Sequence, residues 1–82
     1  MTSQNHWCYR VHREVIDGGE LFAVYNTLHD YETGEPVMRE EFPAMPCGDD
    51  LLTLAMDLGE IVAALGATVL ELDDVPVEEE LT

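Results

Sequence analysis

The sequence predicts one small α+β domain, in which a three-stranded antiparallel sheet packs against a single amphipathic helix. Three observations predict it. The chain has only 82 residues, its first half alternates apolar and polar side chains, and residues 51–65 repeat apolar side chains at helical spacing. A chain of this size buries about 60–65% of the surface that its unfolded form exposes. Its core therefore has to be one sheet against one helix, unless a second copy completes it.

The first strand is predicted over residues 7–15, where side chains alternate with the period of two typical of a half-buried strand. Its apolar side chains are Trp7, Tyr9, Val11 and Val15. The positions between them hold Cys8, Arg10, His12 and Glu14, and His6 belongs to the same set. We expect this polar set on the outward face of the strand.

A hairpin turn follows at residues 17–20, which read Asp-Gly-Gly-Glu. Adjacent glycines tolerate the positive φ that a tight hairpin needs. A second strand is expected over residues 21–31. Two apolar sets compete for its buried face, one with Phe22, Val24 and Leu28 and the other with Leu21, Ala23 and Tyr25.

A second turn is predicted at residues 32–36, because this segment combines Gly34 with Pro36. A third strand is then expected over residues 37–42. Pro43 and Pro46 end it, since proline cannot donate a ladder hydrogen bond.

The helix is predicted from Asp50 to residue 65. Asp50 is a suitable N-cap, Asp49 lies near the positive end of the helix dipole, and Gly66 suits the left-handed residue that closes a helix. One continuous stripe at helical spacing is expected to form the core against the strands. It comprises Leu51, Leu54, Ala55, Leu58, Ile61, Val62 and Leu65.

Residues 68–72 predict a short fourth strand, favoured by Val69 and Leu70. Beyond it the chain is acidic and lacks periodicity. We therefore place the domain at residues 1–74 and expect residues 75–82 to form an acidic flexible tail.

The formal net charge is −15, from eighteen Asp and Glu against three Arg and no Lys. A surface this negative repels phosphate, so direct binding of nucleic acid or of an anionic membrane is disfavoured. The two cysteines are far apart, which indicates free thiols in a reducing compartment. With no secretory signal and no apolar run long enough to span a bilayer, we expect a cytoplasmic protein.

A second stripe on the helix points away from the predicted core face and has small residues that permit close helix approach. It consists of Leu52, Met56, Gly59 and Ala63. We hypothesise that it binds a protein partner, with Asp57 and Glu60 as flanking charges, and that a homodimer through this face is the alternative.

A metal site or a catalytic site is the competing class of function. His6, Cys8 and His12 share one face of the first strand, with His29 and Cys47 expected elsewhere, and these are zinc-ligand types. Their spacing lacks a compact motif, so we expect no metal and no cofactor. Cys8 or Cys47 beside a histidine is a formal catalytic dyad, but no base is positioned by the sequence, and we expect no enzymatic activity.

Acidic pairs carry little information in a chain with eighteen carboxylates. Glu40-Glu41 and Asp49-Asp50 are more simply a solvated strand and a helix start. A further hypothesis is that the domain imitates DNA and occupies a basic groove, as an inhibitor or antitoxin would. The imitation phosphates would be Asp57, Glu60, Glu40 and Glu41.

The order of these segments resembles a group of short bacterial hypothetical proteins that share a hairpin, a third strand and an acidic helix. The matching residues are Tyr9-Arg10-Val11 and residues 17–20, 31–34 and 48–51. That resemblance implies a fold and no activity. A looser resemblance, through Tyr9, residues 17–19, Pro43, Pro46, Gly48 and Asp49, is to the core of HicB-type antitoxins. It implies a related fold and a role in protein binding.

Taken together, the sequence favours a non-enzymatic acidic binding or regulatory module that contacts a basic protein surface. The alternatives are a small enzyme or metal-binding protein using Cys8, His12, His29 or Cys47, and a DNA-mimic or antitoxin-like inhibitor.

Overall fold

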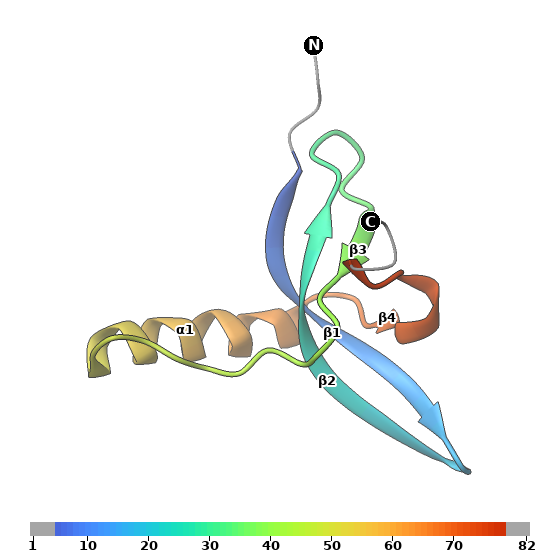
Figure 1. The fold of residues 1–82 in the computed structure, drawn as a ribbon, viewed down its shortest axis with the longest axis horizontal. Coiled ribbons are helices and arrows are strands. Elements are labelled where there is room, and N and C mark those ends of the chain that lie inside the picture. Colours follow the sequence, from blue (N-terminus) through green and yellow to red (C-terminus); the bar gives the residue numbers. More distant parts are fainter. Residues whose placement is uncertain (1–4, 79–82) are drawn as a thin grey trace.

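The computed structural model describes residues 5–78, which form one curled sheet and one α-helix (Figure 1). The strands β1 (His6–Ile16), β2 (Gly19–His29), β3 (Pro36–Arg39) and β4 (Leu70–Glu71) lie in the order β3-β2-β1-β4. Helix α1 (Leu51–Ala63) continues into the 3-10 turn η1 (Ala64–Gly66), and η2 (Leu72–Asp74) follows β4. The predicted α+β fold is confirmed. The sheet is mixed, because β4 pairs parallel with β1.

Strands β1 and β2 form a hairpin that pairs along its whole length, from His6 opposite His29 to Ile16 opposite Gly19. Asp17 (φ 39°) and Gly18 (φ 82°) make the turn between them. Positive φ at both central positions is the hairpin turn whose twist matches the strands, and Asp-Gly suits it. Gly18 is therefore the glycine that the turn requires.

Strands β2 and β3 end earlier than predicted. The side chain of Asp30 accepts hydrogen bonds from the backbone N–H of Glu32 (2.8 Å) and Thr33 (3.3 Å), so the turn begins directly after β2. The regular ladder of β3 ends at Arg39, although the backbone N–H groups of Glu40 and Ala44 still donate to Asn26 O (3.0 Å) and Val24 O (2.7 Å) of β2.

The helix begins as predicted, because Asp50 Oδ1 accepts a hydrogen bond from the backbone N–H of Thr53 (2.8 Å). This bond lowers the pKa of Asp50. The helix also ends close to residue 65, because α1 continues into η1 up to Gly66. The left-handed conformation predicted for Gly66 is wrong, and the helix instead closes by tightening into η1.

The predicted core stripe of α1 is also wrong, because no residue of α1 is buried. Figure 1 shows α1 projecting from one side of the β1–β2 ribbon, with the preceding segment running alongside it. Leu51 is 83% exposed, Val62 62% and Leu65 67%. The side that faces the rest of the chain carries Leu54, Asp57, Ile61 and Ala64.

The segment leading into α1 packs closely along the helix. The backbone N–H of Cys47 donates to Asp57 Oδ2 (3.0 Å). At Gly48 the backbone lies so close to the first helical turn that a Cβ would fall 2.4 Å from the Leu54 nitrogen. The helix reaches the sheet at Asp57, which accepts a hydrogen bond from the Tyr9 hydroxyl of β1, and at its C-terminal end, where Ala64 of η1 is buried.

The C-terminal segment covers the other side of the sheet. The short predicted fourth strand is confirmed as β4, which pairs with His12 and Arg13 of β1, and Val77 bridges to Arg39 of β3. Residues 70–77 (the C-terminal strap) therefore run from one edge of the sheet to the other, opposite α1 (Figure 1).

The expected flexible tail begins too early in the chain. Val75 is 3% exposed, and the backbone N–H of Arg39 donates to Pro76 O (2.9 Å), so residues 75–77 belong to the folded domain rather than to the tail. Residues 79–82 of that tail lie outside the described residues.

Candidate functional site

Two regions of the described chain stand out chemically, and the first is the exposed surface of α1. We call this surface the outer face. It comprises Leu51, Leu52, Ala55, Met56, Leu58, Gly59, Val62, Ala63 and Leu65, all of which are exposed. Every side chain in this set is apolar or absent, in a chain of net charge −15.

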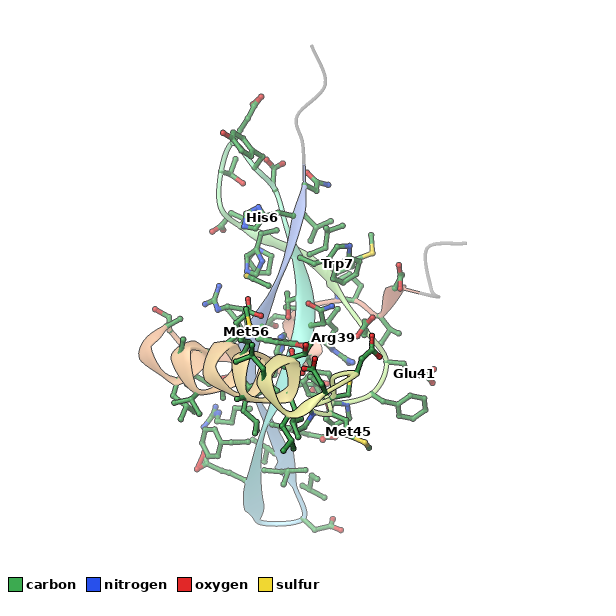
Figure 2. The ribbon with its side chains drawn as sticks, turned by 90° about the vertical axis from the view of Figure 1, so that its left-hand side faces the viewer. His6, Trp7, Arg39, Glu41, Met45 and Met56 are labelled. Carbon is green, nitrogen blue, oxygen red and sulfur yellow. The ribbon has the colours of Figure 1, made fainter. Side chains whose placement is uncertain are left out.

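The four residues of the predicted partner stripe all lie on the outer face. Leu52 is 72% exposed and Met56 64%, and Gly59 and Ala63 are exposed as well. Gly59 and Ala63, one helical turn apart, bring the backbone close to the surface. Figure 2 shows Met56 on α1 and Met45 on the segment before it.

The two predicted flanking charges occupy different positions. Asp57 faces inward and accepts hydrogen bonds from the Tyr9 hydroxyl (2.6 Å) and from Cys47 N. The hydrogen bond to Asp57 raises the pKa of Tyr9 to about 12. Asp57 thus ties α1 to β1 and to the preceding segment, and it is not part of the outer face. Glu60 is exposed beside that face.

The second region is the face of the sheet opposite α1, which we call the polar face. It carries His6, Cys8, Arg10 and His12 of β1, Tyr25, Thr27 and His29 of β2, and Arg39 of β3. Because strand residues alternate, these side chains share one side while Trp7 lies on the other. Figure 2 shows His6 and Trp7 on opposite sides of β1.

The middle of the polar face is covered rather than outward, which corrects the expectation for His12, while His6 at its end is exposed as expected. His12 is 1% exposed, Thr27 0% and His29 3%, and Leu72 and Val75 of the C-terminal strap are buried as well. The polar residues are buried because β4 and Val77 pair with the two edges of the sheet and carry the strap across this side.

His12 and Thr27 form a buried relay of hydrogen bonds. The Thr27 hydroxyl donates to Tyr25 O (3.0 Å), so it accepts from His12 Nε2 (3.0 Å). The His12 Nδ1 atom has no partner in the described residues. Burial, with the charges of Arg39 and Arg10, lowers the pKa of His12 to about 4, and the ring is neutral at pH 7.

His29 lies at the centre of a second group of hydrogen-bonded side chains. Arg10 Nη1 lies 2.9 Å from His29 Nε2, and a guanidinium only donates, so Nε2 is the acceptor. The proton is then on Nδ1, which lies 3.2 Å from Thr27 O and 3.3 Å from Cys8 Sγ. Burial lowers the pKa of His29 and raises that of Cys8.

The sequence placed His29 apart from the first-strand residues, and that expectation is wrong. The structure brings His29 to His6 and Cys8, with one ligand atom of each residue within 4.8 Å of the others. His12 points to Thr27 instead. Cys47 is exposed and lies outside this cluster. His29 joins the cluster because the hairpin register places it directly opposite His6. The periodicity of a single strand contains no information about this pairing.

An open groove of about 530 Å³ lies between β1 and the C-terminal end of α1. Its lining includes Cys8, Arg10, Glu60 and Ala63. Trp7, Tyr9 and Asn26, on the side of the sheet that faces α1, also line it, so the groove lies mainly on that side and borders the outer face.

Comparison of the chain with protein-family models, with curated proteins and with solved structures gives no match. The two resemblances drawn from the sequence stay predictions. No helix within residues 5–78 is both long enough and apolar enough to cross a membrane.

Proposed function

We propose that the protein is a non-enzymatic binding module that docks a basic protein partner on the outer face of α1. One observation carries this proposal: the most solvent-exposed helix of a strongly acidic chain presents a surface without a single charge. Contiguous exposed apolar surface of this kind marks interaction sites in soluble proteins. An amphipathic helix in an apolar groove is a common mode of such recognition.

The charge of the chain favours a basic partner over a second copy. Two copies would bring two net charges of −15 together, whereas a partner with a basic rim would be steered toward the protein. Glu60 beside the outer face and Asp49 before α1 supply negative charge at its border.

The cysteine chemistry supports a binding role over nucleophilic catalysis. An activated cysteine has a lowered pKa, but burial raises the pKa of Cys8. DNA mimicry receives less support, because one of its four imitation phosphates, Asp57, is bonded to Tyr9 and Cys47 within the domain.

The test compares Met56→Glu with Tyr31→Glu. Both side chains are exposed, at 64% and 67%, and both variants add the same charge, but only Met56 lies on the outer face. Proteins captured from the source organism by the wild-type chain are purified, and direct binding is measured by calorimetry at several salt concentrations.

We expect a basic protein whose affinity falls as salt rises and weakens about 30-fold or more with Met56→Glu. Tyr31→Glu should bind like the wild type. If Met56→Glu leaves binding unchanged, the outer face is not the docking surface. If the purified chain instead self-associates through this face, and does so more tightly as salt rises, its occupant is a second copy and the basic partner is ruled out.

A further inference from the structure

We propose that His6, Cys8 and His29 form a binding site for zinc on the polar face. The site is independent of the outer face, and its three ligands come from two paired strands. His6 and Cys8 are two residues apart on β1, so their side chains point the same way. His29 is the residue directly opposite His6 in the hairpin register.

The distances suit a shared ion. Zinc binds cysteine sulfur at about 2.3 Å and histidine nitrogen at about 2.0–2.1 Å, which places two tetrahedral ligand atoms about 3.5 Å apart. Cys8 Sγ and His29 Nδ1 already lie 3.3 Å apart, and the His6 ligand atom lies within 4.8 Å of both. The rings of His6 and His29 stack with centroids 5.6 Å apart. Because a histidine binds zinc in the plane of its ring, the exposed His6 ring has to turn out of this stack to bring all three atoms to one ion.

The ligand types favour zinc over the harder cations. Imidazole and thiolate are borderline and soft donors, whereas magnesium and calcium prefer oxygen. Three protein ligands leave the fourth tetrahedral position to water, and the exposed His6 places the site at the protein surface.

Arg10 competes with the metal in this arrangement. Its hydrogen bond to His29 Nε2 keeps the proton on Nδ1, the nitrogen that faces Cys8. When zinc binds, the Cys8 thiol and His29 Nδ1 each lose a proton to water, and Nε2 takes one up. One net proton is released, and Arg10 has to leave Nε2. Its second nitrogen keeps a partner in Thr68 O (2.7 Å).

The experiment titrates the full chain with Zn²⁺ in competition with a chromophoric chelator, and with Co²⁺ as an optical probe, in excess Mg²⁺. Excess Mg²⁺ occupies the many surface carboxylates, so that binding by oxygen alone is suppressed. We expect one metal per chain, and for cobalt a tetrahedral spectrum with a thiolate charge-transfer band.

Matched variants separate the site from the rest of the chain. Cys8→Ser and the exposed-residue variant His6→Ala should each weaken zinc binding by more than about 100-fold, since even outer-shell partners of a zinc site contribute about 10–100-fold. Cys47→Ser, which removes the other thiol, should not change the affinity.

Arg10→Leu should tighten zinc binding at least about tenfold, because it removes a competing hydrogen bond and a nearby positive charge. Arg13→Leu is its control, with the same change of charge on the other side of β1, where Arg13 pairs with Glu20 and Glu71. Absence of tight 1:1 binding overturns the proposal, as does a cobalt spectrum without thiolate character or a loss of binding with Cys47→Ser.

Discussion

The polar face and the outer face of α1 reverse the usual relation between polarity and burial. Beneath the C-terminal strap, His12 and Thr27 are 1% and 0% exposed, while on α1 Leu51 and Leu52 are 83% and 72% exposed. Both regions belong to one domain, and both lie on regular secondary structure, the polar face on the sheet and the outer face on α1. The difference lies in which segment passes over each of them.

This comparison shows how the two regions are stabilised. Buried polar groups are tolerated where they are hydrogen-bonded, and the relay from His12 through Thr27 to Tyr25 O meets that condition for all but His12 Nδ1. The apolar side chains of the outer face have no covering segment within the described residues. The polar face is therefore a structural core with an exposed end at His6, whereas the outer face is open to solvent, which is why we propose it as the docking surface.

The largest expected effect is a loss of folding stability at acidic pH, caused by protonation of His12 in the polar face. The pKa of His12 falls from 6.5 to about 4 on folding, so the folded state resists its protonation. The neutral His12 ring therefore costs no stability above pH 6.5. As the pH falls from 6.5 toward 4, the free energy of unfolding should decrease by up to about 3 kcal/mol. Urea unfolding measured at a series of pH values should show this slope, and His12→Gln should reduce it. The residual slope includes His29 and, at lower pH, the carboxyls of Asp50 and Asp57, because the pKa values of all three groups are lowered in the folded state. If the free energy of unfolding depends on pH equally in His12→Gln and in the wild type, His12 is not buried as a neutral ring.

A matched pair of valines measures the contrast between the two regions directly. Val75 is 3% exposed under the strap, and Val62 is 62% exposed on the outer face. Val75→Ala should lower the free energy of unfolding by about 2 kcal/mol, because it opens a cavity. Val62→Ala should change it by less than about 0.5 kcal/mol, since alanine also favours the helix. Equal losses in chemical denaturation would mean that Val62 is covered in solution.

The smallest effect concerns the charge that both regions share. At net charge −15, self-repulsion opposes the compact state, and salt screens it over a Debye length of about 8–10 Å. The melting temperature should rise by a few degrees between low and moderate salt. Scanning calorimetry of the wild type checks this, and a flat or falling curve shows that repulsion does not limit stability.

The local elements were largely predictable from the sequence. Period-two alternation located β1, and Asp50 capped α1 where expected. The Asp-Gly-Gly-Glu segment located the hairpin turn, although positive φ falls on Asp17 and Gly18 rather than on the two adjacent glycines. Each depends on residues close together in the chain. The errors lie where a distant segment decides the outcome, as at Val75 and along α1.

The candidate sites divide in the same way. The apolar, uncharged stripe with Leu52 and Met56 is visible in the sequence at helical spacing, and the structure leaves it exposed. The cluster of His6, Cys8 and His29 is not visible, because His29 joins it only through the register of the hairpin. Sequence spacing instead suggested His12, which shares the strand face but turns to Thr27.

The sequence by itself determined the elements, the turn chemistry and the net charge, because propensity, capping and composition act within a few residues. Only the tertiary structure decided which faces are buried. The C-terminal strap crosses the polar side of the sheet, whereas within the described residues no segment covers the outer face of α1. Hydropathy indicates which side chains are stabilised by burial. A side chain is buried only where a second segment packs over it, and the path of the chain determines where that happens.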